Sequence, residues 1–213
     1  MTIPRETIPF PCGSVPDDAG VARLVGLYPQ VQEGLWMQRV KVLGGALTGS
    51  QWRALAQIAR EQTPSAPLHL TTRQDVELHD VAADRVGAVQ TALAEASLTS
   101  LGACGDTLRN VTVCPCSGAA EGTADLAPLA WRIRALLETV EGIYSLPRKF
   151  KISLSACEDA CAQPWINDLG FVAEQHDGQW FFRAVVAGSL GARPETGMLY
   201  ADRVLPREVP ALC

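Results

Sequence analysis

Two short segments combine clustered positive charges with thiols. The first runs from Leu108 to Cys116 and the second from Leu146 to Cys161. Lys and Arg side chains in a water-poor site stabilise an oxyanion, and cysteine thiolates bind soft metal ions or iron-sulfur clusters. The two segments together predict an anionic substrate and a centre that carries electrons.

Four cysteines carry the metal-binding signal. Cys157 and Cys161 are four residues apart, so a helical turn there would point both sulfurs to one side. Cys114 and Cys116 flank Pro115, whose fixed φ would stiffen a ligand loop. Zinc is an alternative metal, although the two-residue gap typical of its cysteine pairs is absent. The thiols could also be small buried groups that pack as weak hydrophobes.

The cations form the second signal. In the segment Lys149-Phe150-Lys151, β-strand alternation would put both ammonium groups on one face and Phe150 in the core. Two like charges side by side cost free energy if they are unpaired, which indicates an anion between them. A solvated surface strand is the alternative.

The composition restricts the class of protein. Of 213 residues, 47% are hydrophobic and 19% are charged, which is typical of a globular protein with a sizeable core. The net charge of -5 argues against a nucleic-acid partner, so any anion site must be local. No apolar run approaches the ~20 residues that span a bilayer, and the N-terminus lacks the plan of a signal peptide. We therefore expect a cytoplasmic protein without a membrane partner, whose seven cysteines are reduced or bind metal.

The first half of the chain must supply a frame for these groups. Residues 1–30 are rich in Pro and Gly and predict an extended arm. Alternation predicts strands at 36–42, 68–72 and 76–79. Helical spacing predicts one helix that is capped by Thr48 or Ser50 and ends before Pro64, and a second helix at 82–96. This order predicts a small α+β unit with helices on one face of its sheet.

The second half repeats this theme less clearly. A helix is expected at 125–140, and Phe150 to Ser155 alternates as a strand. Two further strands, 169–173 and 180–186, flank an Asp-Gly turn and predict a β-hairpin.

Four ordered segments resemble the sirohaem-containing sulfite and nitrite reductases. They are Leu70 to Gln74, His79, Arg109 to Val111, and Leu146 to Lys151. The resemblance covers roughly residues 30 to 205, and the length is that of a half-size, small sulfite reductase. It implies an α+β fold: an arm at 1–30, a ferredoxin-like half-domain at 31–98, and a domain at 99–213 that binds sirohaem and a 4Fe-4S cluster.

The resemblance also implies roles for individual residues. The substrate oxyanion would be held by four cations: Lys41, Arg109, Lys149 and Lys151. The tetrapyrrole would be lined by residues of the matching segments: Thr71, Thr72, Arg73, Gln74, His79 and Asn110. Arg73 would pair with one of the carboxylates of the macrocycle. His69 could do the same, and a strand histidine satisfied within the protein is an equal alternative.

The cysteines match the cluster motif of this family only in part. Cys157 and Cys161 match its second half, in which the last thiolate also bridges the cluster to the sirohaem iron. The family places its first two cysteines six positions apart, but Leu108 and Ala120 occupy those positions relative to Cys114. Cys116 or Cys104 could take the place of the missing ligand, and Cys116 is nearer. The cluster is either intact with shifted ligands or degenerate.

The expected function is that of an oxidoreductase. It would reduce sulfite to sulfide, or nitrite to ammonia, with electrons from a separate donor such as a ferredoxin, because no flavin or nicotinamide motif is visible. The alternatives are a non-catalytic or partner-dependent tetrapyrrole or iron-sulfur subunit, and a corrin-pathway enzyme resembling precorrin-3B synthase. A half-size chain would leave an apolar face exposed, so we expect a homodimer or a heterodimer with a related chain.

Overall fold

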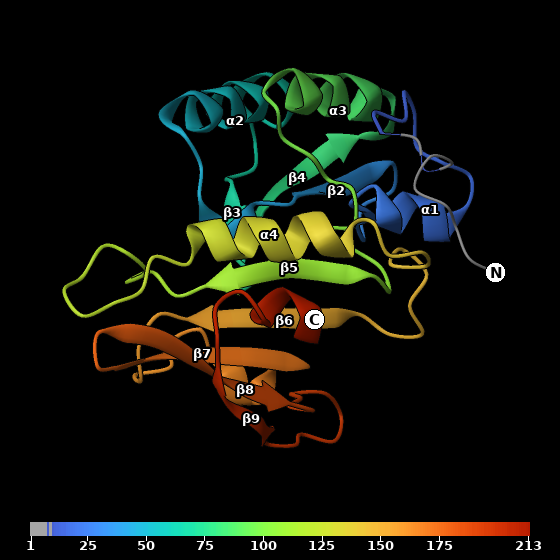
Figure 1. Ribbon diagram of the computed structural model, residues 1–213. Helices are drawn as coiled ribbons and strands as arrows, with labels where there is room; N and C mark the ends of the chain where they lie inside the picture. The colour runs from blue at the N-terminus through green and yellow to red at the C-terminus, as the bar shows by residue number, and fades with distance from the viewer. Residues whose placement is uncertain (1–7, 9) are drawn as a thin grey trace. The chain divides into compact units, whose positions relative to one another are not determined.

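The computed structural model describes residues 8 and 10–213, and the chain divides into two compact units (Figure 1). Unit 1 comprises residues 1–110 and 141–149, and unit 2 comprises residues 111–140 and 150–213. Both units combine helices and strands, which confirms the expected α+β class. Among the described residues, no helix combines the length and apolar character that crossing a membrane requires.

Unit 1 is built on a four-stranded antiparallel sheet in the order β1-β2-β4-β3. Its strands are β1 (Leu27–Pro29), β2 (Leu35–Val40), β3 (His69–Leu70) and β4 (Val76–Ala82). The predicted strands at 36–42, 68–72 and 76–79 correspond to β2, β3 and β4. The sheet places His69 of β3 directly opposite Glu77 of β4.

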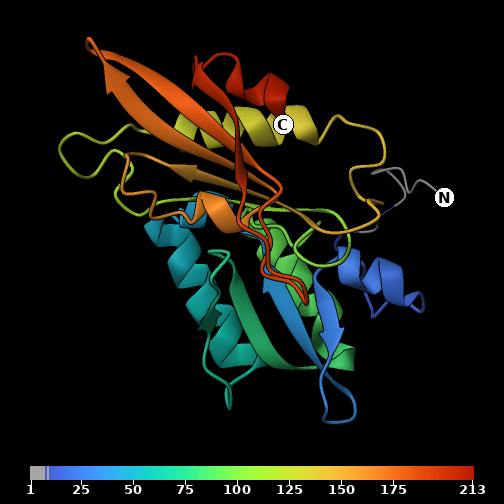
Figure 2. The ribbon, with the colours of Figure 1, turned by 90° about the horizontal axis from the view of Figure 1, so that it is seen from below.

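Two helices cover one face of this sheet (Figures 1 and 2). The first, α2 (Gly49–Gln62), begins at a capping box in which Thr48 and Gln51 each bond the other's backbone N–H. The second, α3 (Val86–Glu95), follows a short 3₁₀ turn, η3 (Ala83–Arg85). Their buried faces contribute Leu55 and Leu93 to a core that also contains Leu78 of β4. Both helices confirm the sequence prediction.

The start of the chain differs from the extended arm that the composition suggests. Residues 1–7 and 9 lie outside the described residues, but helix α1 (Ala19–Leu24) and strand β1 fall within 1–30. Asp18 caps α1 by accepting the Val21 N–H at 2.9 Å, and β1 pairs with β2. Both elements are too short for periodicity to show in the sequence.

Unit 2 contains most of a five-stranded sheet in the order β5-β6-β7-β8-β9. The strands are β5 (Leu108–Val113), which begins in unit 1, β6 (Phe150–Ser155), β7 (Leu169–His176), β8 (Gln179–Val186) and β9 (Met198–Val204). β6 and β7 are parallel, whereas β7, β8 and β9 are antiparallel. Helix α4 (Ala127–Leu137) lies beside the C-terminal 3₁₀ turn η5 (Val209–Leu212) in Figure 2.

The hairpin of β7 and β8 confirms the Asp-Gly prediction. Asp177 and Gly178 both have positive φ, at 50° and 76°, which is the backbone that a tight two-residue hairpin turn requires. The inner faces of the two strands bring Phe171 and Phe182 together edge to face, with ring centroids 6.4 Å apart. This pair forms the centre of the unit 2 core.

Candidate functional site

Unit 1 contains an open cleft of about 530 Å³ whose charged lining residues are mostly cations. Its charged and aromatic lining residues are Arg23, Arg109, Arg148, Lys149, Asp106, Tyr28 and Tyr144. Four positive side chains face one carboxylate, so the cleft favours an anion. The tyrosines add hydroxyl groups that can donate hydrogen bonds to it.

Arg109 is the most buried cation of this cleft, with 8% of its surface exposed. Its Nε is buried and has no hydrogen-bond partner among the described residues. A buried N–H without a partner costs free energy, whereas a bound oxyanion would satisfy it. This unpartnered donor in a cationic cleft therefore fits an anionic ligand.

Lys149 reaches the same cleft because its loop is tied to the start of β5. The Lys149 N–H donates to Asp106 Oδ1 at 3.1 Å, and the Leu146 N–H donates to the Asp106 carbonyl at 3.0 Å. The Thr107 hydroxyl donates to the Ile143 carbonyl at 2.8 Å. These bonds explain how residues 40 positions apart in the sequence line one hollow.

Lys41 is a buried cation that does not itself line the cleft. It is 7% exposed, and its Nζ donates to the Leu108 carbonyl at 3.0 Å. A Cβ placed on Gly102 would lie 3.3 Å from this Nζ and 3.2 Å from the ring of Tyr144, which lines the cleft. Lys41 therefore adds positive charge close to the cleft without forming part of its lining.

Asp75 offsets part of this buried charge. It is 1% exposed, and its Oδ1 accepts the Val42 N–H at 3.2 Å. Burial raises the pKa of Asp75 to about 6, although the Val42 bond and the charges of Lys41, Arg39 and Arg109 act in the opposite direction. The carboxylate is mostly ionised at neutral pH and helps to hold these cations in a dry environment.

Lys151 belongs to unit 2 and is paired. Its Nζ lies 3.9 Å from Asp168 Oδ2, and its backbone N–H donates to the same oxygen at 2.8 Å. Lys149 lies one residue before β6, so only Lys151 belongs to the strand in which the sequence alternation placed both lysines. The argument from two unpaired ammonium groups on one strand therefore fails, because the strand begins at Phe150 and Asp168 neutralises Lys151.

The Thr71 to Gln74 segment forms a tight turn between β3 and β4. The Thr71 hydroxyl accepts the N–H groups of Arg73 and Asp75, at 3.2 and 3.0 Å. Gln74 has a φ of 61°, and Thr72 is exposed. The turn thus fixes Thr71 and presents Thr72 to solvent.

Arg73 and Asn110 hold each other. Arg73 Nη2 donates to the Asn110 carbonyl at 2.8 Å, and Asn110 Nδ2 donates to the carbonyls of Arg73 and Val42, at 2.8 and 2.5 Å. These bonds lock the first part of β5 onto the turn after β3. Both residues therefore position Arg109, which precedes Asn110 in the strand.

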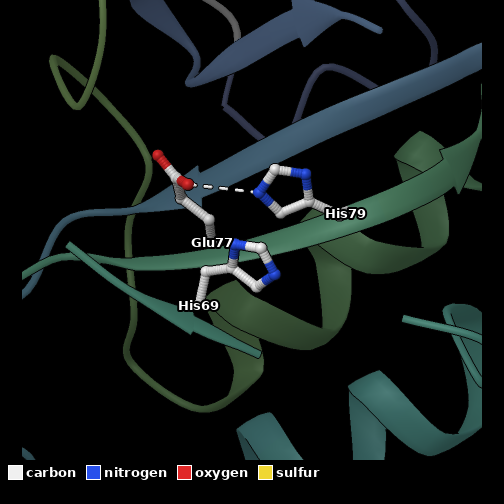
Figure 3. Close-up of side chains that lie close together, drawn as sticks. All are labelled: His69, Glu77 and His79. Carbon is white, nitrogen blue, oxygen red and sulfur yellow. Dashed lines mark hydrogen bonds and ion pairs between the residues drawn. The ribbon is translucent and has the colours of Figure 1, made fainter. Parts of the chain in front are cut away.

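His69 and His79 lie together at Glu77 rather than at the turn. Figure 3 shows the two imidazole rings beside the Glu77 carboxylate. His79 Nε2 is 3.2 Å from Glu77 Oε2, and the two ring centroids are 4.3 Å apart. The structure thus brings both predicted histidines to one place.

Unit 2 carries the four candidate metal-binding cysteines on two loops. Cys114 and Cys116 follow β5, and Cys157 and Cys161 follow β6. The Cys114 N–H donates to the Leu154 carbonyl at 3.0 Å, and Thr112 bonds to the Ile152 carbonyl at 3.3 Å, so the two strands advance in the same direction. Because the carboxyl ends of parallel strands meet at one edge of a sheet, both loops leave the sheet at the same edge.

The thiols of these loops interact. Cys114 Sγ is buried and accepts the N–H of Ala156, the residue before Cys157, at 3.2 Å. The pKa of Cys161 is raised by local desolvation and then by the negative charges of Cys116 and Cys114. Sulfurs that lie near one another in this way can bind one metal cluster together.

The sulfurs of these four cysteines lack the close packing that a single zinc ion would need. Among residues 8 and 10–213, no three cysteine sulfurs lie within 4.8 Å of one another. A single zinc with Zn–S bonds of about 2.3 Å would need sulfurs roughly 3.8 Å apart. Four free thiols on two adjacent loops fit an iron-sulfur cluster, because each thiolate then binds a different iron.

Cys104 belongs to unit 1, whereas the four candidate metal-binding cysteines belong to unit 2. It is fully buried, and burial raises the pKa of its thiol to about 11 despite the nearby charges of Arg39 and Arg109. A thiol of this kind is a poor metal ligand, which favours Cys116 as the replacement in the first half of the motif.

Sequence reasoning missed several residues of the cleft. Arg23 comes from α1, which the sequence did not predict, and Arg148 stands next to Lys149 in the segment that resembles the reductases. The composition carries a further signal for the substrate-binding positions. The chain has only three lysines, which are Lys41, Lys149 and Lys151. All three therefore fall at positions expected to bind the substrate.

Comparison with known proteins identifies the family. The family model described as "Nitrite and sulphite reductase 4Fe-4S domain" matches residues 104–213, and "Nitrite/Sulfite reductase ferredoxin-like half domain" matches residues 28–96. The chain belongs to the nitrite and sulfite reductase family, whose cofactors are sirohaem and a 4Fe-4S cluster. The ferredoxin-like half-domain in the expected fold is thereby confirmed.

Individual relatives are enzymes of both kinds. The chain is 33% identical to an assimilatory ferredoxin-dependent nitrite reductase of Haloferax mediterranei, over 76% of this chain and 30% of that protein. It is 34% identical to a sulfite reductase [NADPH] hemoprotein beta-component of Shewanella denitrificans, over 74% of this chain and 32% of that protein. The chain spans about a third of the length of these curated relatives.

Solved structures agree with the fold. The NirA protein of Mycobacterium tuberculosis superposes with a TM-score of 0.77 at 27% identity, over 89% of this chain and 38% of that protein. Dissimilatory sulfite reductase I has a TM-score of 0.67 at 10% identity, over 80% of this chain and 58% of that protein, and shows the fold alone. The boundaries expected at 30/31 and 98/99 stay a prediction.

Proposed function

We propose that this chain forms part of an enzyme that reduces sulfite to sulfide, or nitrite to ammonia, at a sirohaem coupled to a 4Fe-4S cluster. The observation that carries the proposal is the cationic cleft of unit 1, which Arg109 and Lys149 both line. Arg109 lines that cleft, and its buried Nε has no hydrogen-bond partner within residues 8 and 10–213. The buried positive charge favours a small oxyanion over a neutral ligand.

The cysteines of unit 2 are proposed as cluster ligands. Cys114, Cys116, Cys157 and Cys161 would hold the cluster, with Cys161 as the thiolate shared with the sirohaem iron. Cys161 is the exposed residue of the four, so its sulfur is accessible to a second metal centre. When bound, the two cofactors would supply the electrons one at a time.

The chain's own cations would bind, orient and protonate the substrate. Arg109 presents planar N–H donors that suit an oxyanion, and Lys149 carries an ammonium group that can donate a proton to an oxygen leaving as water. Lys41 adds fixed charge through its bond to the Leu108 carbonyl. Lys151 would contribute less, because Asp168 neutralises part of its charge.

The remaining polar residues are proposed to line the tetrapyrrole: Thr71, Thr72, Gln74, His69 and His79. Arg73 and Asn110 bond each other, and Asn110 also donates to the Val42 carbonyl. Their proposed role is therefore to fix the cofactor-facing turn, and Arg73 would also pair with a carboxylate of the macrocycle.

A separate protein is proposed as the electron donor. Two relatives are named as ferredoxin enzymes and one as a component of an NADPH enzyme, so the donor class differs within the family. A homodimer, or a heterodimer with a related chain, is also proposed. It is supported by the outer strand β9, where Met198, Leu199 and Tyr200 expose more than half of their surfaces.

The test is catalysis by anaerobically prepared protein that is expressed together with sirohaem synthesis. We expect reduction of nitrite or sulfite with reduced viologen, and we expect Arg109→Met to lose most turnover while it keeps the cofactor spectrum. Arg132→Met is the matched control, because Arg132 is an exposed arginine of α4. Equal turnover in the two variants, or a colourless protein, would contradict the proposal.

A further inference from the structure

Asp75 is a buried carboxylate to which the proposed reduction assigns no role. It stands directly before β4, and 1% of its surface is exposed. Its Oδ1 accepts the Val42 N–H at 3.2 Å, whereas its Oδ2 is buried and has no hydrogen-bond partner among the described residues. Thr71 fixes the backbone, because its N–H donates to the Asp75 carbonyl at 2.9 Å and its hydroxyl accepts the Asp75 N–H at 3.0 Å. The carboxylate is therefore held in place with one oxygen that a proton could satisfy.

Ionisable groups from several parts of unit 1 surround this carboxylate. They are Arg39 of β2, Lys41 just after it, Arg109 of β5 and the thiol of Cys104. Arg39 is already paired with Glu77, to whose Oε1 its Nε donates at 2.9 Å. Burial raises the pKa of the Cys104 thiol to about 11, so this group is neutral near pH 7. The charge of Asp75 is thus balanced mainly by the other two cations.

The anion site and this carboxylate lack complementary groups. Arg109 lines the cleft, and its buried Nε has no acceptor within residues 8 and 10–213. In the same part of the chain, Asp75 Oδ2 has no donor. A dry site disfavours a change in its net charge, because ions lose their hydration there. An oxyanion in the cleft adds negative charge, and a proton on Asp75 removes it. The two events should therefore favour each other.

We propose that Asp75 takes up one proton when an oxyanion binds in the cleft, so that the anion binds more tightly at lower pH. The proton comes from solvent, binds Oδ2 and returns to solvent when the anion leaves. Asp75 does not line the cleft, so it acts on the anion through charge and is a positioning residue. The proposal rests on the proposed function, because it concerns the same anion site.

The ionisation of Asp75 falls in a range where this coupling can be measured. Burial raises the pKa of Asp75 to about 6, against the opposing effects of the Val42 hydrogen bond and the neighbouring cations. The carboxylate is therefore charged at pH 8 and mostly neutral at pH 5. A bound anion raises this pKa further, so anion affinity increases as the pH falls from 8 to 5.

The test uses nitrite, which stays a monoanion between pH 5 and pH 8, whereas sulfite changes its charge in that range. For the full chain loaded with sirohaem and cluster, we expect the dissociation constant for nitrite to be about tenfold lower at pH 5 than at pH 8. The spectral change on titration gives this constant without turnover. Calorimetry in buffers of different ionisation enthalpy should show uptake of about half a proton per nitrite near pH 6.5.

Two variants separate the charge of Asp75 from its structural role. Asp75→Asn keeps an oxygen for the Val42 N–H but carries no charge. It should bind nitrite at pH 8 about as tightly as the parent does at pH 5, without dependence on pH. Asp106→Asn is the matched control, because Asp106 lines the cleft but is exposed, and this variant should keep the pH dependence of the parent.

Several results would overturn the proposal. They are equal nitrite affinity of the parent at pH 5 and pH 8, no proton uptake by the parent, uptake that persists in Asp75→Asn, and weaker binding by Asp75→Asn at every pH. Calorimetry on the parent needs neither variant. A chain that reduces nitrite without proton uptake on binding keeps the proposed function and loses the role of Asp75. A chain that binds nitrite with proton uptake but does not reduce it has the opposite outcome.

Discussion

The two units hold their chemical groups in different ways. In unit 1, Lys41 and Arg109 are almost completely buried, and main-chain hydrogen bonds fix Lys41 and the loop of Lys149. In unit 2, the thiols lie on turns after two strands, and Cys161 is exposed. Cations must be fixed and dry to act on an anion, whereas thiols must be reachable for a cluster to assemble on them. The protein alone thus positions the buried cations Lys41 and Arg109, whereas Cys161 is accessible to a ligand.

Thiol reactivity gives the largest contrast between the units. In cluster-free protein at pH 8, we expect Cys104 to react with iodoacetamide at least about 100-fold more slowly than Cys161. Burial raises the pKa of Cys104 to about 11, so little of it is thiolate, and the side chain is covered. Peptide mass spectrometry after timed pulses would measure both rates.

Urea should remove this difference, because unfolding exposes Cys104. Similar rates for the two thiols in the folded protein would show that unit 1 does not protect its interior as described.

Two lysines, Lys149 of unit 1 and Lys151 of unit 2, test the proposed binding of the substrate anion with a smaller expected effect. Lys149→Met should weaken sulfite or nitrite binding by about tenfold, and Lys151→Met by only about threefold, because Asp168 already offsets the charge of Lys151. Binding to loaded protein can be followed by the spectral change on titration. A larger loss for Lys151→Met would reverse the order that the ion pair predicts.

Alanine substitutions at two glycines, one in each unit, should differ by about 1 kcal/mol in their effect on the free energy of unfolding. Gly102 and Gly122 both have a φ of 71°, so alanine is strained by the backbone at either position. At Gly102 the new Cβ would also press on Tyr144 and Lys41, whereas at Gly122 nothing lies within 4 Å. Gly102→Ala should therefore destabilise the protein by about 1 kcal/mol more than Gly122→Ala.

Urea unfolding of both variants would measure that difference. Equal free energies of unfolding would mean that Lys41 is not held against Gly102.

Much of the fold could be predicted because local signals agreed with it. The alternation of Phe150 to Ser155 predicted β6 with its observed bounds, Thr48 was one of two predicted caps of α2, and the Asp-Gly turn predicted the β7 and β8 hairpin. β5 was not predicted as a strand, because all six of its residues are buried and it shows no alternation of polar and apolar positions.

The site could be predicted less well than the fold. The residue types at Lys41, Arg109 and Lys149 pointed to an anion. The cleft, however, depends on two hydrogen bonds between distant parts of the chain, Lys149 to Asp106 and Thr107 to Ile143. Neither bond has a local sequence signal. The pairing of Lys151 with Asp168 likewise arises only when the residues before β7 reach β6.

An iron and acid-labile sulfide count on anaerobically prepared protein, made with sirohaem and repeated for Cys116→Ser and Cys161→Ser, tests the central proposal most directly. The account predicts about five iron atoms for about four sulfides in the parent chain, and loss of the sulfide in both variants. A parent chain without labile sulfide, or a full cluster in the Cys116→Ser variant, would contradict it.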